Sequence, residues 1–226
     1  MESAAALLAQ TPLFGALREE EREAVLSACR TVHYAKGDAI DNDEGLEWFN
    51  ILLEGRVKLV QTDPVSGRSF VSFLLDRGDV FDVIALLDGE RHVTMPVTLL
   101  PTTLLRVPME EARRWLREYP AFNDALLPYL GEKMRHLEAF AESVIFDDTA
   151  TRLARLILRH ARPVEGEERV LAVDHVSHEL LAEMIGSVRS VVTTQLNKLK
   201  QEGLILHQRG KIIVENLEGL LHRYSL

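Results

Sequence analysis

The sequence has almost no cysteine and no long apolar run. Cys29 is the single cysteine among 226 residues. One thiol can form no internal disulfide and cannot supply the four thiolates that an iron–sulfur cluster normally needs, so a Cys-ligated cluster is excluded. The longest apolar runs, such as residues 80–87, are short and broken by acidic residues, which predicts no membrane helix and no secretory signal. We therefore expect a soluble cytoplasmic protein that makes no contact with a membrane.

The sequence is also short of positive charge, but unevenly so. The net charge is −9, yet residues 1–148 hold 15 Lys and Arg against 26 Asp and Glu, while residues 149–226 hold 11 against 9. Binding to nucleic acid depends on Lys and Arg that displace counterions from phosphates. If the protein binds DNA, the C-terminal part is the one expected to do so.

Glycines recur in the first half of the chain at a regular spacing. They are separated by 8, 10, 12, 11 and 11 residues, at Gly37, Gly45, Gly55, Gly67, Gly78 and Gly89. Short β-branched or aromatic runs fill the gaps, as in residues 48–53, 56–61, 69–75 and 93–100. Turn signals at such spacing are typical of short antiparallel strands. Residues 33–108 are therefore predicted to form a β-roll, preceded by a helix over residues 19–29.

A helical pattern over residues 109–119 leads into a long helix with one narrow apolar stripe. Pro128 is expected to kink or break this region, with the regular helix beginning near it. The apolar residues that follow are spaced 3, 4, 3, 4 and 3 apart, which is a heptad seam suited to one partner helix. A helix lying on its own domain's core is the alternative. The predicted dimer interface consists of Leu127, Leu130, Met134, Leu137, Ala141 and Val144.

A domain boundary is predicted at residues 146–149, where capping residues precede a helix over 150–162 and an exposed loop over 163–169. Ser177 can then cap a helix over residues 178–185. Gly186 permits a tight turn, and a second helix follows over residues 189–201. Two helices around a short glycine turn predict a helix-turn-helix, although such units also occur in proteins that never bind DNA.

The second of these helices has a polar face that contains no acidic residue. Val192, Leu196 and Leu199 form its buried stripe, so the opposite face is exposed. An α-helix fits the major groove, where arginine can read guanine, and Arg189 is the leading base-contacting residue. Residues 204–208 and 211–214 predict a β-hairpin wing with Arg209 and Lys211 near a phosphate. The predicted DNA-binding residues are Ser177, Ser187, Arg189, Ser190, Thr193, Thr194, Asn197, Arg209 and Lys211.

Five segments recur in a characteristic order along the chain. They are Tyr34-Ala-Lys-Gly37, Asn50-Ile-Leu-Leu-Glu-Gly-Arg-Val-Lys-Leu59, Gly78-Asp-Val-Phe-Asp82, Leu181-Ala-Glu-Met-Ile-Gly-Ser-Val-Arg189 and Gly203-Leu-Ile205. Together they resemble the Crp/Fnr superfamily of bacterial transcription regulators, over essentially the whole chain. The resemblance implies an α+β protein with an N-terminal antiparallel β-roll of the cyclic-nucleotide-binding jelly-roll type with eight strands, a long dimerisation helix and a C-terminal winged helix-turn-helix.

The resemblance also implies partners and a division into domains. A helix and sensor roll are expected over residues 1–108, helices that include the dimerisation helix over 109–146, and the DNA-binding domain over 149–226. The expected partners are a second copy of the chain, a palindromic duplex operator, RNA polymerase and a small-molecule effector. Relatives often carry Arg-Glu and a later Arg in the recognition helix, whereas this chain has Arg189-Ser190 and Thr194, so its operator sequence is expected to differ.

The effector region departs from relatives that bind cyclic nucleotides. Where they carry Gly-Glu for the ribose and Arg-Ser or Arg-Thr for the phosphate, this chain has Asp82-Val83 and His92-Val93, and Leu137-Glu138 replace purine-contacting hydroxyl residues. An anionic phosphate would lose several charge-assisted hydrogen bonds here. Cyclic AMP is therefore not expected to act as the effector. The predicted effector pocket consists of Asp82, Val83, His92, Val93, Leu137 and Glu138.

Several other ligands stay open at the level of sequence. A less polar pocket would suit haem, with His33, His92, Cys29 and Met95 as candidate ligands, which would make the protein a gas or redox sensor of the same fold. A dicarboxylate such as 2-oxoglutarate is an alternative, because cyanobacterial nitrogen regulators have a valine that resembles Val83. It would need cations, for which the candidates are Arg91, His92, Lys133 and Arg135. A cupin-like metal enzyme is a remote alternative, since no metal-ligand spacing or hydrolase motif is visible, and the protein is not expected to be an enzyme.

Overall fold

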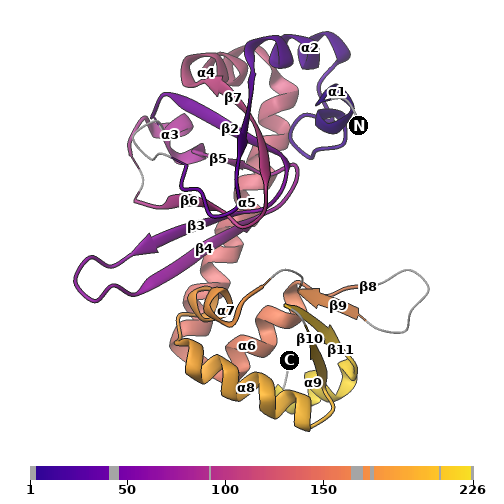
Figure 1. Cartoon of the computed structure of the whole chain (residues 1–226). Helices are drawn as coiled ribbons and strands as arrows, with labels where there is room; N and C mark the ends of the chain where they lie inside the picture. The colour runs from indigo at the N-terminus through magenta and orange to yellow at the C-terminus, as the bar shows by residue number, and fades with distance from the viewer. Residues whose placement is uncertain are drawn as a thin grey trace. The chain divides into compact units, whose positions relative to one another are not determined.

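A computed structural model describes residues 4–40, 46–91, 93–163, 170–173, 176–208 and 210–224. The chain divides into two units, one formed by residues up to Gly67 and Val71–His136, the other by Arg68–Phe70 and Leu137–Leu226. Most elements of both units are labelled in Figure 1. This division falls within helix α5 (Pro120–Phe146). The domain boundaries expected near residues 108 and 147 therefore stay a prediction.

The first unit is a β-roll covered by helices. Its strands form a four-stranded sheet in the order β1-β7-β2-β5 and a three-stranded sheet in the order β4-β3-β6. Among the described residues this gives seven strands, with an isolated antiparallel bridge between Ala39 and Val97. The elements are α1 (Ala4–Ala9), α2 (Glu19–Ala28), β1 (Arg30–Tyr34), β2 (Trp48–Glu54), β3 (Val57–Thr62), β4 (Ser69–Leu75), β5 (Val80–Phe81), α3 (Val83–Asp88), β6 (Met95–Thr98), β7 (Thr102–Pro108), α4 (Met109–Glu118) and the start of α5.

Alternation along the strands builds two separate cores. On β7, Leu105 and Val107 join the core beneath the helices, whereas Leu104 points into the roll. Successive side chains of a strand point to opposite faces, so one strand serves both cores. Helices α1, α2, α4 and α5 all contribute to the core on the helical side, and the roll interior is a smaller cluster of β-strand residues.

The helical-side core is organised around Trp115 of α4, which is fully buried. Its ring makes edge-to-face contacts with Phe14, Phe49 and Phe122, with ring centroids 6.1, 6.4 and 5.9 Å away. These contacts join the N-terminal segment, strand β2 and helix α5 to α4. Such aromatic pairs stabilise a core beyond the area they bury.

One glycine of the roll is required by close packing. Gly55 has a φ of +97°, and a Cβ there would lie 2.5 Å from Thr102 Oγ1 and 2.6 Å from the Pro101 carbonyl oxygen. A side chain at this position would force the backbone of the turn away from the start of β7. The β2–β3 turn therefore accepts only glycine.

Helix α5 begins at Pro120 and runs without a break through Pro128. The expectation of a break at Pro128, or of a regular helix that begins near it, was wrong, whereas the expected kink stays a prediction. Pro120 occupies the first turn, where the missing N–H is not needed. Pro128 removes one backbone hydrogen bond, but the buried Phe122 and Leu126 hold the preceding turns against the core.

The second unit contains the C-terminal elements and one sheet, in the order β10-β11-β9-β8. Helix α6 begins after Asp148, whose carboxylate accepts a hydrogen bond from the Thr151 N–H at 2.7 Å. It ends at Arg159, three residues before the predicted end, because Arg162 belongs to a strand. The elements are α6 (Thr149–Arg159), β8 (Arg162–Pro163), β9 (Val170–Val173), α7 (His178–Ile185), α8 (Arg189–Gln201), β10 (Ile205–Gln208), β11 (Lys211–Val214) and α9 (Leu217–Tyr224).

Most of the predicted loop, residues 164–169, lies outside the described residues, and Pro163 belongs to β8. The helix α5 is long, but no helix in the described parts of the chain combines the length and the apolar character that crossing a bilayer requires. The predicted class, α+β with a β-roll, a long helix and a winged helix-turn-helix, is confirmed.

The aromatic cluster gives a first prediction. Replacing Trp115 with alanine leaves a cavity between three rings and is expected to lower the free energy of unfolding by about 3–5 kcal/mol. Urea unfolding followed by circular dichroism measures the change. Val65→Ala is the control, because Val65 is 93% exposed and its change should stay within about 0.5 kcal/mol. Equal effects of the two substitutions would contradict this account of the core.

Candidate nucleic-acid interface and effector region

Helices α7 and α8 form the predicted helix-turn-helix. The Ser177 hydroxyl accepts a hydrogen bond from the Leu180 N–H at 3.1 Å and so caps α7. Gly186 ends α7 in the left-handed conformation, with a φ of +63°. The Gly186 and Ser187 N–H groups both donate to the Ala182 carbonyl. The turn is therefore closed by backbone bonds, and α8 begins three residues after the glycine.

Helix α8 buries one stripe and exposes the rest. Val192, Leu196 and Leu199 are buried, as predicted. The helix contains no acidic residue, and its last turn carries Lys198 and Lys200. Six of the predicted DNA contacts lie on this helix or just before it. Ser187 and Thr193 are half-buried, and the other four are exposed. The four are Arg189, Ser190, Thr194 and Asn197.

Two threonines of α8 already use their hydroxyl groups within the helix. Thr193 Oγ1 donates to the Arg189 carbonyl at 2.9 Å, and Thr194 Oγ1 donates to the Ser190 carbonyl at 3.0 Å. Thr193 Oγ1 also lies 2.7 Å from His178 Nδ1 of α7. Both hydroxyls keep lone pairs that can accept a hydrogen bond, but neither has a free proton.

The wing is the hairpin of β10 and β11. Its four pairs run from Ile205 with Val214 to Gln208 with Lys211. Gly210 at the tip has a φ of +77°, and its carbonyl accepts a hydrogen bond from Val176 N–H at 3.1 Å, which ties the wing to the start of α7. Lys211 is exposed, and Arg209 lies outside the described residues.

Most of the predicted dimer seam is exposed on α5. Leu127, Met134, Leu137 and Val144 are 66%, 63%, 42% and 44% exposed. Ala141 is exposed as well, whereas Leu130 is half-buried against the helical-side core. Ile145 and Phe146 at the end of the helix are also exposed, and the heptad spacing did not include them. The stripe is an apolar surface that the single chain leaves in water.

The roll contains a buried polar cluster that the sequence analysis missed. Asn50, Asp82 and Arg106 are each less than 5% exposed. The Asn50 amide donates to the Asp82 carboxylate, and Arg106 donates to the Tyr34 hydroxyl at 3.3 Å. The guanidinium groups of Arg106 and Arg30 lie 5.3 and 3.8 Å from the centre of a Trp48 ring. The sequence did contain a signal for this cluster. Arg106 follows Leu104 by two residues on β7, so the two side chains point to the same, inward face of the strand.

Three comparisons place the chain among known proteins. Family models for a cyclic nucleotide-binding domain and a Crp-like helix-turn-helix domain match residues 31–119 and 151–223. A global nitrogen regulator of Synechococcus elongatus is 30% identical over 179 residues, which are 77% of this chain and 80% of the relative. The chain belongs to the Crp/Fnr family of transcription regulators.

Other Crp/Fnr proteins match over nearly the whole length. A CRP-like cAMP-activated global transcriptional regulator of Mycobacterium tuberculosis is 21% identical, over 96% of this chain and 98% of its own. The solved structure of a CooA mutant from Carboxydothermus hydrogenoformans superposes with a TM-score of 0.78 at 21% identity and covers 97% of this chain and 98% of its own. The predicted family and function, a Crp/Fnr-type transcription regulator with a helix-turn-helix DNA-binding domain, are thereby confirmed.

The structure distributes the predicted effector residues of this Crp/Fnr protein over different environments. Asp82 is buried with a φ of +64°, a left-handed conformation rare outside glycine, and Val83 begins α3 and packs on the helical-side core. Val93 is 72% exposed. Leu137 and Glu138 are exposed residues of the second unit, and His92 lies outside the described residues. A pocket formed by all six stays a prediction.

Three of the four haem-ligand candidates lie among the described residues, and His92 does not. Burial raises the pKa of the Cys29 thiol to about 12, so the thiolate that would bind iron is scarce at neutral pH. His33 Nδ1 lies 3.1 Å from the Thr103 hydroxyl, and Met95 is partly exposed on β6. Within the described ranges, no three His, Cys, Asp or Glu side chains gather as metal ligands.

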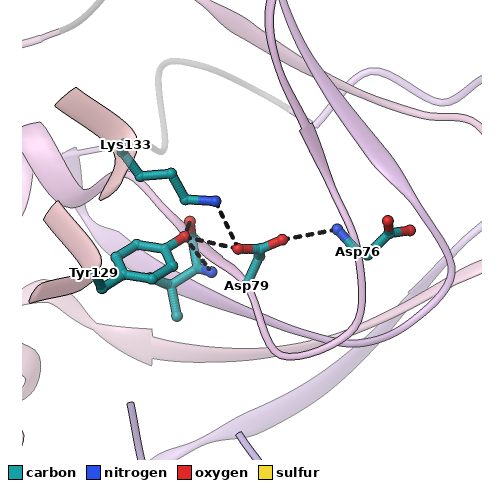
Figure 2. A network of polar contacts seen from close by, with 5 residues as sticks. Asp76, Asp79, Tyr129 and Lys133 are labelled. Carbon is teal, nitrogen blue, oxygen red and sulfur yellow. Dashed lines mark hydrogen bonds and ion pairs between the residues drawn. The ribbon is translucent and has the colours of Figure 1, made fainter. Parts of the chain in front are cut away.

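Lys133, one of the cations considered for a dicarboxylate, is held by the roll. Its Nζ lies 2.9 Å from Asp79 Oδ1, which also accepts a hydrogen bond from the Tyr129 hydroxyl at 3.0 Å, as Figure 2 shows. The other carboxylate oxygen of Asp79 accepts from the Asp76 N–H at 2.9 Å. Burial and the Asp79 charge raise the pKa of Tyr129, so it stays protonated as the donor. The network fixes the first half of α5 on the β4–β5 turn.

Proposed function

We propose that two copies of the chain pair along the exposed stripe of α5 and bind a palindromic operator through their winged helices. The observation that carries this proposal is the recognition helix α8, whose apolar stripe is buried while its exposed face is polar and free of acids. Two-fold symmetry would place the two reading helices in successive major grooves about 34 Å apart. The complex would work in the cytoplasm with RNA polymerase as its partner and would catalyse no reaction.

Roles on the DNA follow from position along the module. Arg189 begins the recognition helix, where N-terminal residues contact base edges, and its guanidinium can bind guanine O6 and N7. Ser190, Thr194 and Asn197 follow on the exposed face. Ser177, Ser187 and Thr193 lie at or near the ends of α7 and α8, and Lys211 begins strand β11 of the wing. We expect these residues, together with Arg209, to contact phosphates.

A base-contacting arginine gives the second prediction. Arg189→Ala is expected to weaken binding to the operator by about 1–3 kcal/mol. The operator is first selected from random duplexes with the wild-type protein, and fluorescence anisotropy then measures affinity. Arg223→Ala is the control, because it removes one positive charge from the same unit on helix α9. A similar loss in both variants, or a footprint that Arg189→Ala leaves unchanged, would refute the base contact.

The stripe on α5 gives the third prediction. Met134→Glu would place a carboxylate in the apolar seam and is expected to weaken dimerisation at least about tenfold, because burying an unpaired charge costs more than about 1.4 kcal/mol. Sedimentation velocity over a concentration series measures the change. Val65→Glu adds the same charge to an exposed apolar residue elsewhere and should leave the dimer intact. A monomeric wild-type protein under all conditions would contradict the proposal.

The protein is also proposed not to respond to cyclic AMP. At the position where relatives carry glycine, this chain has the buried Asp82, which adopts a left-handed backbone conformation and accepts a hydrogen bond from the Asn50 amide. The following residue, where relatives carry the ribose-binding glutamate, is Val83, which packs on the helical-side core and has no acceptor for a hydroxyl. Val93 replaces a hydroxyl residue that would face the phosphate. Several charge-assisted hydrogen bonds are therefore missing.

The fourth prediction tests this directly. Isothermal titration with cyclic AMP is expected to show no binding in the micromolar range, and the affinity for the selected operator should not change when the nucleotide is added. The cAMP-activated relative from M. tuberculosis serves as the positive control for the titration. Micromolar binding by this chain would overturn the prediction.

A further inference from the structure

The first half of the recognition helix is intrinsically weak. Residues 191–194 are four consecutive β-branched residues, which lower helix propensity. Val188 at the N-cap makes no side-chain capping bond. The hydroxyls of Thr193 and Thr194 bond back to carbonyls of the first turn, a pattern that tends to bend helices. The turn that carries Arg189 therefore needs support from outside the helix.

That support comes from His178, the first residue of α7. Its Nδ1 lies 2.7 Å from Thr193 Oγ1, and Thr193 Oγ1 lies 2.9 Å from the Arg189 carbonyl oxygen. A threonine hydroxyl has one proton. Because that proton goes to the carbonyl, which can only accept, the Thr193 oxygen must accept from the imidazole. His178 thus carries a proton on Nδ1, and a chain of two hydrogen bonds joins α7 to the Arg189 backbone.

A second imidazole lies against the first. The rings of His178 and His207 lie 4.8 Å apart with a tilt of 40°, and His207 belongs to strand β10 of the wing. Burial, His178 and Lys200 all lower the pKa of His207, so this ring is neutral at pH 7 and can pack against its neighbour. The pair connects α7, α8 and the wing, which are the three elements expected to meet DNA.

On the basis of the function proposed above, we infer that His178 is a positioning residue for operator recognition: by donating to Thr193 it sets the first turn of α8, and with it the direction of Arg189. Thr193, considered from sequence as a DNA contact, acts in this arrangement as the internal anchor. The inference predicts a loss of discrimination between DNA sequences. Affinity for DNA in general should change little, because the Nδ1 atom of His178 is directed at Thr193 inside the module and not at a phosphate.

The fifth prediction uses the full-length protein and two labelled duplexes, the selected operator and a scrambled duplex of equal composition. His178→Ala is expected to weaken operator binding about tenfold and to change binding to the scrambled duplex less than twofold. His178→Asn should stay within about threefold of wild type on the operator, because Asn Nδ2 occupies the place of Nδ1. Thermal melting of each variant confirms that the domain is folded before affinities are compared.

A double-mutant cycle tests the link itself. Thr193→Val keeps the side-chain shape but removes the hydroxyl, and it should cost as much as His178→Ala. Combining the two should add nothing further, because they remove the same interaction. Additive losses would overturn the inference, as would equal losses in His178→Ala and His178→Asn. A parallel loss on both duplexes with a smaller salt dependence, restored by His178→Arg, would instead make residue 178 a phosphate contact and overturn the positioning role.

One readout does not depend on DNA. Long-range proton–nitrogen NMR spectra of the histidine rings are expected to show His178 as the Nδ1–H tautomer in the wild type, with that preference lost in Thr193→Val. An Nε2–H tautomer in the wild type would overturn the inference even if operator binding is normal. Conversely, a wild-type protein that selects no DNA sequence but shows the Nδ1–H tautomer would refute the proposed function and leave the link between the helices established.

Discussion

A helix that buries one narrow stripe must leave its opposite face in water. This constraint determines which side chains of helix α8 are exposed. Val192, Leu196 and Leu199 attach it to the second unit, and nothing else on the helix is fully buried. The stripe fixes which side chains are presented. It does not fix the angle of the first turn, because the apolar contacts begin only at Val192. Polar contacts from α7 must supply that part of the geometry, which is why the capped and closed turn before α8 matters.

The roll shows the opposite arrangement, with polar groups buried inside an apolar shell. Burying a charged group is costly unless it is hydrogen-bonded and paired. Asp82 accepts a hydrogen bond from Asn50, and Arg106 donates one to the Tyr34 hydroxyl, so each buried charged group has a polar partner on a strand of the roll.

The sequence predicted the regular parts of this structure well and the irregular parts poorly. Turn glycines around β-branched and aromatic runs located β2 and β4 to within a residue or two. Helical spacing and capping residues located α4, α7 and α8 equally well. Pro128 does not end α5, since its local effect on the helix is weaker than the packing of Phe122 and Leu126. The short elements α1, α3, β8 and β9 lacked enough residues to show a period.

The candidate site divides in the same way. The exposed face of α8 and the stripe on α5 follow from spacing alone, so their residues could be identified from sequence. The partners of Thr193 and of Asp82 could not, because His178 is 15 positions away and Asn50 is 32 positions away. Hydrogen bonds between elements depend on side-chain direction and on how helices and strands meet. A single sequence carries no periodic signal for either.

Charge explains why this geometry should matter more here than in a strongly basic protein. The C-terminal part has only two more basic than acidic residues, and the N-terminal part is strongly acidic. Non-specific affinity for DNA grows with the number of phosphates neutralised, so it is expected to be modest. The affinity for an operator must then come largely from base contacts, which require an accurately directed side chain. A short chain of hydrogen bonds behind the first turn of α8 is the kind of structure that can provide that direction without adding charge.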